Sequence, residues 1–260
     1  MLLLLLIVIF ALAFLVGLIG NISGIGGGVM IILFLIYVFG FNPLDAAGLS
    51  LLTLVFSSLT GFVQNMRQKL VDIRLFLIMA TVAVFGALFG SFLASYVPSG
   101  IFKGVFSTIL ITLGLFSVYA SRMQTRGGVE EYSSRPAHSP DTGIVSLIAG
   151  IVSGFIGIGI GGIIGTYLTA IKRSQPKRAI ATIIAATLPV TVAGMALHFY
   201  YTGFINIAYA PPLVIGAFLG GIIGSWVIRK APQVSLRFFQ GYIIIAFGVL
   251  SAALYLLSTY

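Results

Sequence analysis

The chain has 260 residues, of which 59% are hydrophobic and 7% are charged, whereas a soluble domain carries about 25% charged residues. A water-soluble globular protein is excluded, because so few ionisable side chains cannot cover a core of that size. The absence of cysteine excludes disulfides, thiolate metal sites and a cysteine nucleophile. A net charge of +9 suggests nucleic-acid binding in a soluble protein, but in a membrane protein it follows from basic cytoplasmic loops. We therefore expect membrane lipid as a partner, and no nucleic acid.

The apolar segments predict an all-helical integral membrane protein. A transmembrane helix needs about 20 predominantly apolar residues, and seven segments qualify: 2–20, 44–66, 74–96, 101–120, 177–199, 207–228 and 238–257. The first segment lacks the basic start and the cleavage site of a signal peptide, so we expect it to remain as a helix. Three shorter segments, 29–41, 143–156 and 160–171, have the length of re-entrant arms or buried helices. The number of full crossings is therefore open.

Basic residues predict the orientation in the membrane. They occupy four connections: Arg67, Lys69 and Arg74; Arg122, Arg126 and Arg135; Lys172, Arg173, Lys177 and Arg178; and Arg229, Lys230 and Arg237. The alternate connections contain just Lys103. Because Lys and Arg near helix ends stay in the cytoplasm, the four basic connections are predicted to be cytoplasmic. Both termini are then outside the cytoplasm, and the location is the cell (inner) membrane.

A polar linker divides two related halves. Residues 121–142 have a flexible, charged composition and separate a first repeat, 1–120, from a second, 143–260. A shift of 133 residues pairs Gly24 with Gly157, Gly28 with Gly161 and Pro43 with Pro176, and a shift of 134 then pairs Gly86 with Gly220 and Pro98 with Pro232. The basic loop 67–74 pairs with a loop that has no basic residue, 201–206. Equivalent loops on opposite sides indicate inverted-topology repeats, which are typical of secondary transporters.

Two glycine clusters, 20–28 and 154–162, interrupt the apolar segments in equivalent places. Glycine favours unwinding of a helix, and irregular backbone at membrane depth needs hydrogen bonds from protein or from a water-filled cavity. The helix that follows each cluster would point its N-terminal N–H groups into the break, which suits an anion. The alternative is that glycine lets helices approach closely, and this packing role is favoured for Gly86 with Gly90 and for Gly220 with Gly224.

The candidate binding site combines these breaks with nearby polar side chains. Its predicted members are Asn21, Ser23, Gly24, Gly26, Gly27, Gly28, Ser57, Ser58, Gly157, Gly159, Gly161, Gly162, Thr187 and Thr191. Hydroxyl groups in membrane helices also bond to their own backbone, which is the structural alternative. Asn65 and His198, which the repeat pairs, lie near opposite faces of the membrane and are predicted to be gates. The alternative roles for His198 are a proton-coupling group and a hydrogen-bonded histidine at the membrane interface. Asp45 and Asp72 sit at helix ends and no Asp or Glu lies deeper in an apolar segment, so we expect no carboxylate relay. Backbone carbonyl groups could still bind Na+, but we expect no metal site of side chains and no cofactor.

The order of motifs resembles the sulfite exporter TauE/SafE family of membrane permeases. The matching features are Ser23 to Gly28, the segment 42–50, Gly61 with the basic loop and Val71-Asp72, and Pro98 before the last helix of the first half. The chain departs from the usual Gly-Thr-Ser of the third helix by having Gly48-Leu49-Ser50, so no role of that threonine is carried over. The resemblance implies a permease for small sulfur-containing anions such as sulfite, thiosulfate, sulfoacetate or other organosulfonates.

We therefore predict an exporter that works by alternating access at a central anion site. The membrane potential alone favours outward movement of an anion, without a coupling ion. A passive anion channel is the nearest alternative. An intramembrane serine hydrolase with Ser153 as nucleophile and His198 as base would require contact between those two side chains. An assembly or scaffold protein would move no solute.

Overall fold

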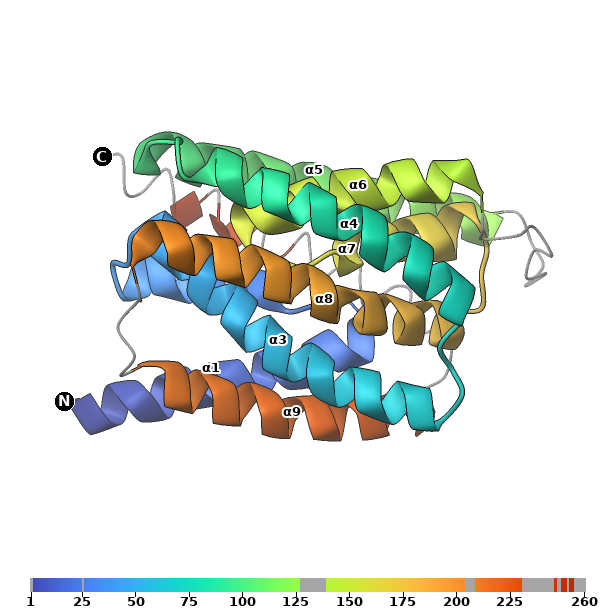
Figure 1. Cartoon of the computed structure of the whole chain (residues 1–260), viewed down its shortest axis with the longest axis horizontal. Helices are drawn as coiled ribbons and strands as arrows, with labels where there is room; N and C mark the ends of the chain where they lie inside the picture. The colour runs from blue at the N-terminus through green and yellow to red at the C-terminus, as the bar shows by residue number, and fades with distance from the viewer. Residues whose placement is uncertain are drawn as a thin grey trace.

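The computed structural model describes residues 2–24, 26–126, 139–203, 209–230, 246, 249–251 and 253–254. All regular elements in these ranges are helices, so the all-helical prediction is confirmed (Figure 1). The first half contains α1 (Leu2–Ser23), α2 (Gly28–Leu33), the π-helical turn η1 (Phe34–Val38), α3 (Pro43–Arg67), α4 (Ile73–Ala94) and α5 (Ser99–Arg126). The second half contains α6 (Pro140–Ile156), α7 (Gly161–Thr166), the π-helical turn η2 (Tyr167–Ile171), α8 (Pro176–Thr202) and α9 (Ala210–Lys230).

Local sequence signals explain several helix ends. The side chain of Asn42 accepts a hydrogen bond from the Leu44 N–H at 3.1 Å and caps α3, and Asp72 caps α4 through the Leu75 N–H at 3.1 Å. Helices α3, α6 and α8 each begin with proline, which has no N–H at a position where a helix could not pair one. Helix α5 continues to Arg126, so the first six residues of the predicted linker are helical. The linker residues 127–138 and most of the predicted span 238–257 lie outside the described residues.

The protein is a multi-pass membrane protein. Six described helices, α1, α3, α4, α5, α8 and α9, are long and apolar enough to cross a bilayer. Large apolar side chains such as Phe85, Leu115 and Ile144 are exposed on the outer surface, where a soluble protein would present charges. Lipid is the solvent that suits such a surface.

Each half begins with a helical hairpin that returns to the end from which it started. In the second half, Lys172 Nζ after η2 lies 2.7 Å from Asp141 Oδ2 in the first turn of α6. In the first half, the N-terminus and the start of α3 lie at the same end of the molecule (Figure 1). The short arms, α2 with η1 and α7 with η2, are therefore the returning limbs of these two hairpins.

The packing is consistent with the predicted inverted repeat. Helices α2 and α7, and likewise α3 and α8, begin 133 residues apart. In Figure 1 α3 and α8 run in opposite directions, as do α1 and α6. The most extensive helix contacts also correspond between the halves. Helix α1 packs along α9, and its counterpart α6 packs along α4, the counterpart of α9. Helix α3 packs against its own counterpart, α8, in the centre.

Small residues allow these helices to cross closely. A Cβ added to Gly90 would meet the carbonyl oxygen of Ile151, and one added to Gly220 would meet that of Phe14. Gly86 and Gly224 similarly face the backbone of a neighbouring helix. The packing role predicted for these four glycines is confirmed.

Candidate functional site

The two glycine clusters break their helices and meet in the interior. Positive φ angles occur at Gly24 (72°), Gly26 (98°), Gly157 (77°) and Gly159 (81°), and such angles favour glycine over residues with a side chain. A Cβ on Gly26 would lie 3.0 Å from the carbonyl oxygen of Ile158. One on Gly28, which has no positive φ, would lie 2.6 Å from the carbonyl oxygen of Gly157. The predicted breaks are therefore present and packed against each other.

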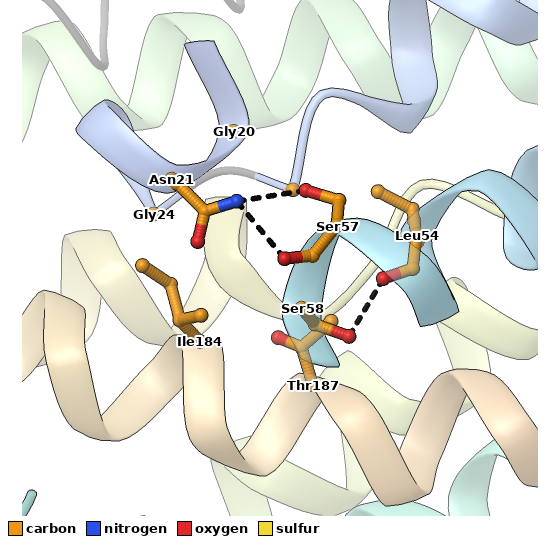
Figure 2. A pocket seen from close by; sticks show the side chains of 9 residues that line it. Gly20, Asn21, Gly24, Leu54, Ser57, Ser58, Ile184 and Thr187 are labelled. Atoms are coloured by element: carbon orange, nitrogen blue, oxygen red, sulfur yellow. Dashed lines mark hydrogen bonds between the residues drawn. The ribbon is translucent and has the colours of Figure 1, made fainter. Parts of the chain in front are cut away.

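A small pocket lies beside the first break (Figure 2). Its lining residues come from α1, the first break, α3 and α8: Gly20, Asn21, Gly24, Gly26, Leu54, Ser57, Ser58, Ile184 and Thr187. The space open to the centre of a water molecule is about 10 Å³, close to the minimum that holds one water. The lining contains amide and hydroxyl groups and no ionisable side chain. In this conformation the pocket is too small for a sulfur oxyanion.

Asn21 and Ser57 form the polar centre of the pocket. The Asn21 amide Nδ2 donates to Ser57 Oγ at 2.8 Å, and it lies within 3.1 Å of the Ser57 carbonyl oxygen and 3.0 Å of the Gly17 carbonyl oxygen. These two carbonyl oxygens can only accept, so they fix the orientation of the amide; Ser225 Oγ from α9 lies 3.2 Å from Asn21 Oδ1 and 2.8 Å from the Gly221 carbonyl oxygen, and it can donate its one proton to either. Because Ser57 Oγ accepts from Asn21, its own proton is available to donate to a molecule in the pocket.

The other two hydroxyl groups of the pocket are engaged by their own helices. Ser58 Oγ donates to the Leu54 carbonyl oxygen at 2.6 Å, and Thr187 Oγ1 donates to that of Ile183 at 2.8 Å. This is the structural alternative predicted for membrane serine and threonine. Ser58 and Thr187 therefore present lone pairs to the pocket, and each must rotate before it can donate to an anion.

The structure brings six of the fourteen predicted site residues together in the pocket lining: Asn21, Gly24, Gly26, Ser57, Ser58 and Thr187. The lining does not include Ser23, Gly27, Gly28, Gly157, Gly159, Gly161, Gly162 or Thr191. Ser23 and Thr191 donate to carbonyl groups of their own helices, Ser23 to Ile19 and Thr191 to Thr187. Gly20, Leu54 and Ile184 were missed; Gly20 belongs to the same glycine cluster, but the two apolar residues carry no chemical signal.

The second break is closed by side chains that donate to its carbonyl groups. Ser50 Oγ donates to the Gly157 carbonyl oxygen at 2.7 Å. Ser91 Oγ and His198 Nε2 donate to the Gly154 carbonyl oxygen at 3.1 and 2.8 Å. These contacts satisfy the unwound backbone with protein groups. His198 thus contacts a carbonyl group, and the Ser153–His198 hydrogen bond that a hydrolase needs is not formed, since Ser153 Oγ has no hydrogen-bond partner among the described residues.

The two predicted gates lie toward opposite ends of the central helices. His198 is in the last two turns of α8, and Asn65 is in the last turn of α3; both are fully buried. Asn65 differs from its repeat counterpart because neither Nδ2 nor Oδ1 has a hydrogen-bond partner among the described residues. A buried amide left without partners is costly, so this side chain is not explained by packing alone.

Basic residues gather at one end of the molecule, which we call the basic end. Helix α3 ends there, and α4 and α8 begin there, joined by a 3.0 Å hydrogen bond from the Asp72 N–H to Thr182 Oγ1. The basic end contains Arg67, Lys69, Arg74, Lys172, Arg173, Lys177 and Arg178, and Lys103 lies at the opposite end, in the first turns of α5.

An ion pair between Asp141 and Lys172 at the basic end links the two ends of the second hairpin, formed by α6, α7 and η2. Hydrogen bonds from Lys172, Ser139 and Tyr167 lower the pKa of the Asp141 carboxyl well below its ordinary value, with Lys172 as the largest cause. Asp141 in turn raises the pKa of the Lys172 ammonium. The Tyr167 hydroxyl donates to Asp141 Oδ2 at 2.7 Å. No group of His, Asp or Glu that could hold a metal is found in the described part of the chain.

Comparison with known proteins identifies similar chains. Residues 9–251 match the family model described as "Sulfite exporter TauE/SafE". The "Probable membrane transporter protein YunE" of Bacillus subtilis (strain 168) is 26% identical over 261 residues, which cover 93% of this chain and 95% of that protein. The "Probable membrane transporter protein YdhB" of the same organism is 24% identical over 230 residues, with coverage of 86% and 91%. No solved structure matches the chain.

Proposed function

The chain belongs to the sulfite exporter TauE/SafE family, whose members are membrane transporters and not enzymes, and on that premise we propose that it transports small sulfur-containing anions. Sulfite, thiosulfate and organosulfonates are the proposed substrates. The pocket beside the first glycine break is the proposed binding site. The observation that carries this proposal is a buried pocket lined by neutral hydrogen-bonding groups from both halves, with no carboxylate in the lining. A carboxylate there would repel an anion, and its absence favours one.

Ser57 is the proposed first donor to the anion, because its hydroxyl proton is free while Asn21 holds its oxygen. Ser58 and Thr187 would add donors after rotating away from their own helices. The first N–H groups of α2, the helix that follows the first break, have no partner within that helix. They would add a partial positive charge without a fixed cation.

The size of the pocket supports alternating access. The open space is about 10 Å³, so the conformation described is a closed one, and the anion must be admitted by movement. We propose that the two repeats, 1–120 and 143–260, rock against each other around the contact between α3 and α8. Because the pocket receives residues from both halves, such a movement would open it.

We also propose that the basic end faces the cytoplasm of a cell whose inner membrane holds the protein, with both termini outside. Export then follows the membrane potential. The cysteine-free chain allows a direct test with single variants Lys69→Cys and Ser99→Cys, both at exposed positions. In intact cells a membrane-impermeant maleimide should label Ser99→Cys alone. Labelling of Lys69→Cys alone would reverse the orientation.

The function is tested with purified protein in proteoliposomes. Uptake of radiolabelled sulfite, thiosulfate, sulfoacetate and taurine is measured for the wild type and for Ser57→Ala, with Ser95→Ala as the control, since Ser95 is far from the pocket and donates to its own helix. We expect sulfur-anion uptake that Ser57→Ala lowers about tenfold, the cost of one lost hydrogen bond to a charged group. No uptake of any of these anions contradicts the proposal, and currents far above carrier turnover identify a passive channel instead.

A further inference from the structure

Three isoleucines close the pocket on the side of the basic end. Ile22 of α1 packs with Ile180 and Ile184 of α8 as a small apolar cluster separate from the two larger ones, and we call these three residues the isoleucine plug. Ile184 lines the pocket and stands beside Asn21 and Thr187 in Figure 2. Since α8 begins at the basic end, Ile180 lies one turn nearer to that end than Ile184.

Two isoleucines of the plug pack closely against glycine residues of α3 and of the first break. A Cβ on Gly24 would lie 3.1 Å from the side chain of Ile180, and one on Gly61 would collide with Ile184. Both isoleucines are nearly inaccessible, with 1% and 5% of their surface exposed. An anion leaving the pocket toward the basic end therefore has no path until α1 and α3 separate from α8.

The Asn65 side chain lies at the same height as Ile180, at the end of the isoleucine plug that is nearer to the basic end. Helices α3 and α8 run in opposite directions (Figure 1), and Gly61 faces Ile184. One helical turn further along α3 reaches Asn65, while one turn back along α8 reaches Ile180. Two residues beyond Asn65, α3 ends at Arg67, whose side chain is exposed.

The residues at the corresponding positions of the other half show that the hydrogen bonding of Asn65 differs from that of its counterpart. The 133-residue shift pairs Ile184 with Leu51 and Asn65 with His198. Leu51 faces Gly194 as Ile184 faces Gly61, so the apolar closure is present in both halves. His198, however, donates through Nε2 to the Gly154 carbonyl oxygen at 2.8 Å and leaves Nδ1 alone without a partner, whereas both polar atoms of Asn65 lack a partner among the described residues.

We propose that Asn65 is a second binding group for the transported anion, and that the anion reaches its amide from the pocket when the isoleucine plug opens toward the basic end. The amide supplies two N–H donors to an oxyanion. The polar atoms that are unpartnered in the closed conformation are then satisfied in the open one, where the exposed arginine and lysine side chains attract the anion further. This inference rests on the proposed function and extends the path beyond its pocket.

The test separates binding in the pocket from passage beyond it. Asn65→Leu keeps the side-chain size and removes the amide. Ser57→Ala serves as the pocket comparison, and Gln64→Leu serves as the matched control, since Gln64 precedes Asn65 but reaches toward Ile222 on α9. Radiolabelled sulfite and thiosulfate are used in parallel, with uptake measured in proteoliposomes, equilibrium binding measured in detergent, and thermal unfolding recorded for each variant.

We expect Asn65→Leu to lower uptake about tenfold, equivalent to one lost hydrogen bond to an anion. Equilibrium binding should stay within about twofold of the wild type, and the melting temperature should be unchanged or raised, because a buried unpaired amide is replaced by an apolar group. Ser57→Ala should instead weaken binding itself. Gln64→Leu should leave uptake and binding unchanged.

Unchanged uptake in Asn65→Leu would overturn this proposal while leaving the proposed function in place. Uptake and melting temperature that fall together would also overturn it, since they indicate a structural role. No uptake by the wild type would refute the proposed function and, with it, this extension. Normal uptake in the wild type with impaired uptake in a stable Asn65→Leu supports both.

Discussion

The two glycine breaks occupy equivalent places in the two halves, yet their surroundings differ. Beside the first break, Asn21 and Ser57 form the polar centre of a pocket. At the second, Gly154 stands where the repeat places Asn21 and Val190 where it places Ser57, and the carbonyl groups are covered by Ser50, Ser91 and His198. Among the described residues the two equivalent breaks therefore differ, with a polar pocket beside the first, and we expect the path of a solute through the protein to be asymmetric.

The largest effect should come from the contact shared by both breaks. Gly28→Val places side-chain atoms where the carbonyl oxygen of Gly157 and Ser50 Oγ already lie, at 2.6 and 2.7 Å from the position of a Cβ. Overpacking of this kind costs about 1–3 kcal/mol, and we expect uptake to be abolished and the melting temperature to fall.

Gly100→Val is the control for this substitution, since a Cβ on Gly100 meets no atom within 4 Å. It should behave as the wild type in both measurements. Normal uptake by Gly28→Val would mean that the two breaks are not in contact in the working transporter, and the comparison between them would lose its basis.

The next effect is specific to the first break. Asn21→Asp keeps the shape of the side chain but replaces the amide donor to Ser57 Oγ with a carboxylate that would face the anion. Repulsion between like charges at close range should weaken sulfite binding by at least about 100-fold, as measured by equilibrium binding in detergent. Gln64→Glu adds the same charge to α3 on the side toward α9 and should retain nearly normal binding; equal losses in both variants would point to net charge rather than to the pocket.

Much of the fold was readable from the sequence because a helix that crosses a membrane needs a long apolar segment. The repeat offset, the helix starts at Pro43 and Pro176, and both glycine breaks follow from residue types that dictate local backbone geometry. The hairpin of α6 and α7 is not readable from the sequence, because segment length alone does not show whether two short helices turn back on each other. The ion pair between Asp141 and Lys172 shows that the two ends of this hairpin meet, although they are 31 positions apart in the chain.

The site was less predictable than the fold. Glycine clusters indicate where the backbone unwinds, but not which side of the break is filled by a neighbouring helix. Gly28 and Gly157 pack on each other, whereas Gly24 and Gly26 line the pocket. Leu54 and Ile184 line it as apolar residues with no chemical signature. Hydroxyl groups at helical spacing could not reveal that Ser58 and Thr187 donate to their own backbone.

A smaller effect is expected at the second break. Ser50→Ala removes the donor to the Gly157 carbonyl oxygen, a contact of 2.7 Å that lies outside the pocket lining. The buried carbonyl loses a partner, so the free energy of unfolding should fall by about 1–3 kcal/mol, measured by thermal unfolding, while sulfite binding is unchanged. This is the reverse of Ser57→Ala, which should reduce binding with little loss of stability. If Ser50→Ala impaired binding at constant stability, the second break would be part of the binding site after all.

The smallest effect concerns a difference at the ends of the hairpins. Asp141 and Lys172 pair across the second hairpin, whereas the repeat places Val8 and Phe39 at the corresponding positions of the first. Because the folded protein lowers the pKa of Asp141, the stabilisation is present at neutral pH and is lost as the pH falls below about 4, the ordinary carboxyl range. The melting temperature of Asp141→Asn should therefore be lower than that of the wild type at pH 7, and the two should converge in acid. The difference should be small because the Asp141 side chain is exposed to solvent, and Lys172→Gln combined with Asp141→Asn should add little further loss. A difference that persisted unchanged in acid would mean that the hairpin is held by the packing of Tyr167 rather than by the ion pair, and the two hairpins would then be closed by the same apolar means.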